Sequence, residues 1–138
     1  MPMVSDESSG AGRAAKLATE LLTRKLGRLG DYPETIVEQA LQTYEVFVRA
    51  YIGIMRFKDP LYPADRTDSL QIDMAVVDEM RHFYSDYQHI TRDFLRMDRL
   101  LSQLARTNRE NQPQRYQQII DEIRSPNEKA DLMKGVMQ

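Results

Sequence analysis

The apolar residues of this chain recur mostly at alternating intervals of three and four, the spacing of one face of an α-helix. The clearest series runs without interruption from Val76 to Leu104, and we refer to it as the 76–104 seam. Its nine members are Val76, Met80, Phe83, Tyr87, Ile90, Phe94, Met97, Leu101 and Leu104. An average period of about 3.5 residues is typical of a helix that packs lengthwise against other helices. The pattern therefore predicts an all-α protein, an elongated bundle of four to five helices with one long central helix at about 70–106.

Two further helices are predicted before this one and two after it. A stripe of alanines and leucines predicts the first helix from Arg13 to Leu29, ended by Gly30. A broader stripe predicts the second helix from about Tyr32 to Phe57, and we expect this helix to be the most buried. Two short helices are predicted near 112–124 and 126–136.

Recurrent capping signals support these helical boundaries. A short polar residue is followed three positions later by an acid or an amide in four places, which is the form of a helix-capping box. The four pairs are Asp31–Glu34, Asp68–Gln71, Asn111–Gln114 and Ser125–Glu128. The segment 58–67 contains two prolines, so it is expected to be the one substantial loop.

Length and composition indicate a single soluble domain. A chain of 138 residues can bury a core without metals or disulfides, and 41% hydrophobic with 29% charged residues is ordinary for a globular protein. Residues 1–12 are small, polar and acidic, so we expect a disordered leader followed by one helical domain at 13–138. No apolar run reaches the roughly 18 residues that span a bilayer, so no membrane contact is expected. The chain has no cysteine, and a cytoplasmic location is the default expectation.

The predicted long helix poses a geometric problem. Residues 64–112 contain neither glycine nor proline, so no residue in this stretch obliges a break. Such a helix would be roughly 55 Å long, whereas a compact chain of this size is only about 37 Å across. Part of the seam would then project and form an interface, made by Ile90, Phe94, Met97, Leu101 and Leu104. The alternative is a local bend with the C-terminal helices covering the seam, which would leave a monomeric bundle.

A non-enzymatic role follows from this interpretation. The chain has no cysteine, no serine in a Gly-x-Ser-x-Gly setting and no phosphate-cradling glycine loop. We therefore predict no catalytic activity and no cofactor. The expected function is that of a helical adaptor or assembly subunit, acting through apolar helix faces in a homo-oligomer or a larger complex with protein partners.

A basic surface supports an alternative function. Cations gather on the first helix and on the second half of the long helix. They are Arg13, Lys16, Arg24, Lys25, Arg28, Arg92, Arg96 and Arg99. If the two regions adjoin, they could bind a phosphate backbone in a nucleic-acid-associated accessory subunit. A net charge of −2 argues against wholesale nucleic-acid binding, and such cations also simply keep helices soluble.

An acid–histidine stripe supports a third function, divalent-metal binding. Glu79, His82, Asp86 and His89, with Asp93 beyond them, lie at spacings of three and four beside the seam. Glu-x-x-His pairs hold metals in carboxylate bundles, although those sites draw ligands from several helices. The competing interpretation is a solvated stripe of weak helix-surface pairs.

Overall fold

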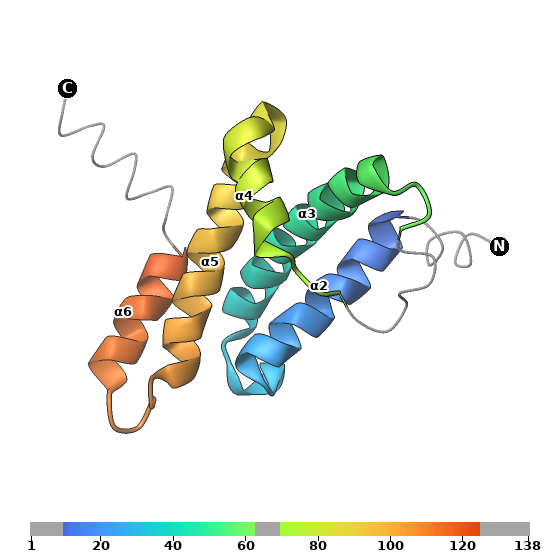
Figure 1. Ribbon diagram of the computed structural model, residues 1–138. Coiled ribbons are helices and arrows are strands. Elements are labelled where there is room, and N and C mark those ends of the chain that lie inside the picture. The colour runs from blue at the N-terminus through green and yellow to red at the C-terminus, as the bar shows by residue number, and fades with distance from the viewer. Residues whose placement is uncertain (1–9, 63–69, 125–138) are drawn as a thin grey trace.

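The structure is a computed structural model that describes residues 10–62 and 70–124, and all regular elements within these ranges are helical (Figure 1). The five α-helices of the described residues are α2 (Gly10–Leu26), α3 (Glu34–Lys58), α4 (Met74–Phe83), α5 (Gln88–Arg106) and α6 (Pro113–Arg124). Two short 3-10 turns join them, η1 (Leu29–Asp31) and η2 (Ser85–Tyr87). The predicted all-α bundle is confirmed, and the predicted helix at 126–136 lies outside the described residues.

Helix α3 is the centre of the bundle. It packs against α2, α5 and α6, and nine of its side chains are buried at helical spacing. The ring of Phe47 stacks on that of Phe94 from α5, with centroids 3.8 Å apart and planes 9° apart. Among the described helices α3 contributes the most buried residues, as its broad apolar stripe predicts.

The boundaries of α2 and α3 differ from those expected. Helix α2 starts at Gly10 and ends at Leu26, because Gly27 adopts a left-handed backbone with φ of 84° and its N–H donates to the Thr23 carbonyl at 2.7 Å. Only glycine adopts this conformation without a Cβ penalty, so Gly27 and not Gly30 ends the helix. Asp31 does not cap α3. Pro33 occupies the N-cap position and offers no side-chain hydrogen bond.

Helix α4 also starts later than its sequence signal. The Asp73 carboxylate accepts a hydrogen bond from the Ala75 N–H at 2.9 Å, so Asp73 is the N-cap. The Asp68 and Ser125 signals lie outside the described residues. At the start of α6, Asn108 folds the preceding turn by accepting from the N–H groups of Glu110 and Asn111. Pro113 is the first residue of α6, close to the predicted start.

The predicted single helix at 70–106 is wrong, because the chain breaks between α4 and α5. Tyr84 is extended, with φ of −110° and ψ of 92°, and η2 follows it before α5 begins. The Tyr87 N–H donates to the Tyr84 carbonyl at 2.9 Å, and the Gln88 side-chain amide donates to the His82 carbonyl at 3.3 Å. These hydrogen bonds satisfy backbone groups that the break would otherwise leave without a partner. The helix can therefore end here without a glycine or a proline.

This bend folds both halves of the seam onto the molecule's own core. Six of the nine seam residues are buried: Val76, Met80, Phe94, Met97, Leu101 and Leu104. The predicted interface is therefore wrong for four of its five residues, since only Ile90 remains partly exposed. Burial of apolar surface within one chain outweighs the continuity of a single helix. The bend alternative, with α6 packed on α5, is what the structure contains.

Candidate docking groove

The uncovered part of the seam lies at the bend. Phe83, at the end of α4, is 80% exposed, and Phe57, near the end of α3, is 81% exposed. Both rings line a hollow of about 410 Å³ between the end of α3 and the bend. We call this hollow the aromatic groove, and its lining residues are Gly53, Ile54, Phe57, Phe83, Tyr84, Ser85, Asp86 and Tyr87.

Gly53 lines the groove from α3. It is an exposed glycine in the interior of α3, where it stabilises the helix less than alanine by about 1 kcal/mol. A Cβ built on it would meet only the Tyr87 hydroxyl oxygen, at 3.9 Å. Packing therefore does not require glycine here. The missing side chain instead enlarges the hollow between the two helical segments.

The exposure of the two phenylalanines is the unusual feature of the groove. Burying a phenylalanine side chain is favourable by about 1.5 to 3 kcal/mol, so a monomer gains nothing by presenting two of them to water. Leu61, in the turn after α3, is also 74% exposed. Single exposed apolar residues are common, whereas clustered ones around a hollow mark interaction sites.

One ion pair connects the two walls of the groove. Lys58 Nζ lies 2.7 Å from Glu79 Oε2, which joins the end of α3 to the helical turn before Phe83. The hydrogen bond to Glu79 raises the pKa of Lys58. Both side chains are exposed, so this pair orients the walls more than it stabilises them.

The polar groups of the groove suit binding better than catalysis. Tyr84, Ser85, Asp86 and Tyr87 line the hollow together with the two phenylalanines. Among these lining residues there is no histidine or lysine that could act as a base toward the Ser85 hydroxyl. An apolar floor with a few hydrogen-bonding groups at its edge is the composition of a recognition pocket.

The structure does not assemble the predicted metal ligands. Glu79 pairs with Lys58, and the Nδ1 atom of His82 lies 2.9 Å from the Asp78 carbonyl oxygen. The helix break falls between His82 and Asp86, so Asp86 and His89 no longer continue the stripe of α4. No group of three or more histidine, aspartate or glutamate residues in the described ranges could hold a metal ion.

The predicted basic surface is only partly assembled. Helices α2 and α5 do adjoin, but several of the eight cations contact acceptors of their own chain. Arg24 donates to the Leu70 carbonyl and Arg96 donates to the Glu122 carbonyl, at 3.0 and 3.1 Å. Lys25 lies 3.2 Å from Asp98. Phosphate binding by the eight predicted cations stays a prediction.

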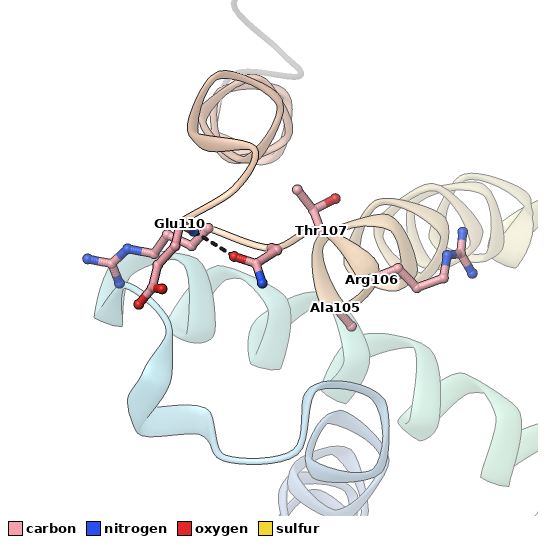
Figure 2. A pocket seen from close by; sticks show the side chains of 6 residues that line it. Ala105, Arg106, Thr107 and Glu110 are labelled. Atoms are coloured by element: carbon pink, nitrogen blue, oxygen red, sulfur yellow. Dashed lines mark hydrogen bonds between the residues drawn. The ribbon is translucent and has the colours of Figure 1, made fainter.

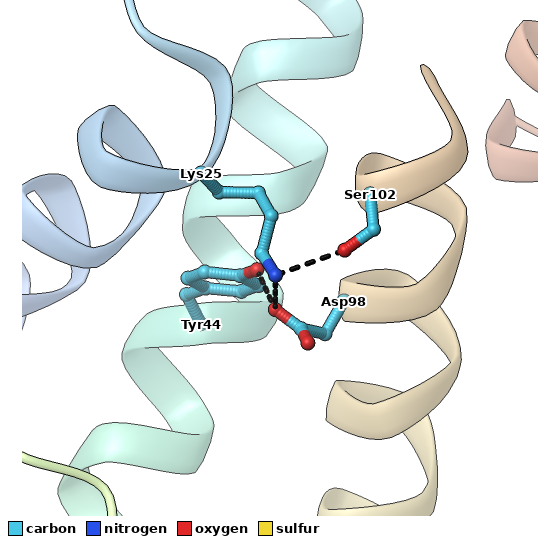
Figure 3. Close-up of polar contacts among 4 residues, drawn as sticks. All are labelled: Lys25, Tyr44, Asp98 and Ser102. Atoms are coloured by element: carbon cyan, nitrogen blue, oxygen red, sulfur yellow. Dashed lines mark hydrogen bonds and ion pairs between the residues drawn. The ribbon is translucent and has the colours of Figure 1, made fainter. Parts of the chain in front are cut away.

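Lys25 belongs to a polar cluster that the sequence analysis missed, which we call the Asp98 clamp (Figure 3). The Tyr44 hydroxyl donates to Asp98 Oδ1 at 2.6 Å, and Lys25 Nζ donates to Ser102 Oγ at 2.9 Å. The clamp thus joins α2, α3 and α5. Tyr44 is only 1% exposed, and burial together with the Asp98 hydrogen bond raises its pKa well above 10. The clamp serves the stability of the bundle.

The raised pKa of Tyr44 predicts a loss of stability in alkali. The unfolded tyrosine ionises near its ordinary pKa of 10.0, whereas the folded one retains its proton. Stability contributed by Tyr44 is therefore complete below pH 10 and declines as the pH rises further. We expect the difference in unfolding free energy between wild type and Tyr44→Phe to be constant from pH 7 to 9 and to shrink by pH 11. Urea unfolding at each pH measures it, and a constant difference up to pH 11 would contradict this account.

A second hollow lies at the α5–α6 connection and is less suited to binding (Figure 2). It measures about 770 Å³ and is lined only by the consecutive residues 105–110. In Figure 2 the side chains of Arg106 and Glu110 point in different directions and do not converge on one point. The nearby Arg109 guanidinium instead lies over the Tyr116 ring, 6.0 Å from its centroid. This hollow is the open space on the inner side of the loop that connects α5 to α6.

The groove that sequence reasoning missed carried two local signals. Gly53 is a glycine inside a segment whose other residues favour a helix, and Phe57 lies outside the apolar stripe of α3. No helix of the described residues is long and apolar enough to cross a membrane. Comparison of the chain with protein-family models, with curated proteins and with solved structures found no match.

Proposed function

We propose that this protein is a non-catalytic adaptor that docks an apolar segment of a partner protein in the aromatic groove. The observation that carries the proposal is that Phe57 and Phe83, each about four-fifths exposed, line one hollow. An adaptor role was also expected from the seam. The proposed binding surface, however, is the groove at the bend and not the predicted interface on α5.

The groove favours a partner segment with large apolar anchors. A hollow of about 410 Å³ accommodates one or two large side chains. An amphipathic helix presents such side chains at spacings of three and four, and laying its apolar face into a groove is a recurrent mode of recognition. Asp86, Ser85 and the Tyr87 hydroxyl would set the register by hydrogen bonds, while the two rings supply most of the affinity.

A displayed library of helical peptides tests this function. Peptides selected on the wild-type chain should bind the Phe57→Ser/Phe83→Ser variant about 100-fold more weakly, because two rings contribute roughly 3 kcal/mol. Fluorescence anisotropy of the labelled peptides measures both affinities. The double variant should remain as stable as wild type, since both rings are exposed.

Met74→Ser is the matched control. Met74 is 60% exposed but lines a different hollow beside α2, so its replacement should leave peptide binding unchanged. The proposal fails if no peptide is enriched, or if the enriched peptides bind wild type and the Phe57→Ser/Phe83→Ser variant equally well.

A further inference from the structure

A separate hollow lies beside the Asp98 clamp, where side chains of α2, α3 and α5 meet the start of α4. It measures about 360 Å³, which is within the range of about 300 to 1,000 Å³ that small-molecule sites occupy. We call it the clamp pocket. Most of its lining is apolar, and these side chains are Leu21, Tyr44, Ile72, Met74, Phe94 and Leu95.

The apolar lining of the clamp pocket is only partly covered by the protein itself. Leu21, Ile72 and Leu95 pack against the core but are only partly buried, and Met74 is 60% exposed. Covering this surface with an apolar ligand is favourable, and a methionine side chain adapts readily to the shape of what covers it. The pocket therefore suits a ligand with an apolar body.

The polar lining of the pocket carries a net positive charge. It consists of two cations, Arg24 and Lys25, and one carboxylate, Asp98. Lys25 Nζ lies 3.2 Å from Asp98 Oδ1, so these two charges compensate each other (Figure 3). Arg24 instead donates to a neutral carbonyl, that of Leu70, at 3.0 Å. Within residues 10–62 and 70–124 no carboxylate forms an ion pair with Arg24, so its charge has no counter-ion there.

Both cations have N–H groups that a ligand can use. The Lys25 ammonium has one N–H group beyond the two that face Asp98 and Ser102. The planar guanidinium of Arg24 matches the two oxygens of a carboxylate. A cationic ligand would be repelled by Arg24, whereas an anionic ligand is attracted to it. The charges of the lining therefore favour a carboxylate as the head group.

We propose that the clamp pocket binds a small monocarboxylate with an apolar body, whose carboxylate pairs with Arg24 and Lys25 while its body covers the partly buried apolar side chains. Burial of the body supplies most of the affinity, and Arg24 supplies the selectivity for an anion. This site is separate from the aromatic groove, so the inference does not rest on the proposed function.

Isothermal titration calorimetry with octanoate tests the site, and octylamine and 1-octanol are matched probes with the same apolar body. Octanoate should bind wild type about tenfold more tightly than octylamine, because only the carboxylate gains charge-assisted hydrogen bonds from Arg24. This comparison needs no variant, so it tests the charge selectivity of the folded wild-type protein directly.

Two arginine variants test the head-group contact. Arg24→Gln should weaken octanoate binding about tenfold and leave 1-octanol binding unchanged, because only the charge-assisted contact is lost. Arg28→Gln is the matched control, since Arg28 is also exposed but does not line the pocket. It should bind octanoate as wild type does. Circular dichroism checks that both variants are folded.

The Phe57→Ser/Phe83→Ser variant distinguishes the clamp pocket from the aromatic groove. It should bind octanoate as tightly as wild type, and a loss of binding would overturn the inference, because the ligand would then occupy the groove. The inference is also overturned if octanoate shows no binding up to about 1 mM or if octylamine binds as tightly as octanoate. Equal losses of octanoate affinity in Arg24→Gln and Arg28→Gln would overturn it as well.

Discussion

Leu101→Asp should unfold the protein, and it should not merely dissociate an assembly. Leu101 is fully buried, and a charge placed at such a position lowers the free energy of unfolding by more than about 4 kcal/mol. A domain of this size has a total of about 5 to 15 kcal/mol. Circular dichroism should show loss of helix at 25 °C, or a urea midpoint far below that of wild type.

Phe83→Asp is the matched control, because it also introduces an aspartate at a position of the 76–104 seam. Phe83 is 80% exposed, so the variant should lose no more than about 1 kcal/mol, mainly from the negative charge at the end of α4. A helical, folded Leu101→Asp protein of smaller hydrodynamic size would contradict the fold. It would mean that the seam is an interface between copies, as a continuous helix would require.

Asp98→Ala should lower the free energy of unfolding by about 2 to 4 kcal/mol. The change leaves the buried Tyr44 hydroxyl without its acceptor and Lys25 without its ion-pair partner. Because the clamp joins three helices, its loss affects the whole bundle. Urea unfolding monitored by circular dichroism measures the effect.

Two variants separate the clamp from a general charge effect. Glu45→Ala removes the exposed ion pair with Arg49, whose atoms are 2.7 Å apart, and should cost less than about 0.5 kcal/mol. Tyr44→Phe combined with Asp98→Ala should be less destabilising than the sum of the two single changes, because no hydroxyl is then stranded. Equal losses for Asp98→Ala and Glu45→Ala would show that the clamp contributes no more than a surface pair.

Local signals explain why most helices could be predicted. Apolar spacing and the proline at the first position of α6 act within a few residues, so they locate α3 and α6 to within about two residues. The same locality explains the errors. Gly27 and Gly30 are equally able to end α2, and only the course of the chain into η1 selects Gly27.

The groove could not be predicted as a site, because it depends on the bend. Phe83 and Phe94 belong to one apolar series, yet one is 80% exposed and the other 6%. Their periodicity is the same. What differs is whether another helix (α2, α3 or α6) packs against the side chain. The residue pattern within α4 and α5 does not determine this.

The amino-acid sequence by itself determined that the chain is helical, which faces of its helices are apolar and that its core contains no thiol chemistry, since these depend on residue type and spacing. The tertiary structure alone decided that the seam bends at Tyr84, that Asp98 meets Tyr44 and Lys25, and that two phenylalanines remain outside. The reason is that burial is shared among helices distant in sequence. A break costs a few local hydrogen bonds, whereas folding both halves of the seam onto the core of the bundle removes six large side chains from water.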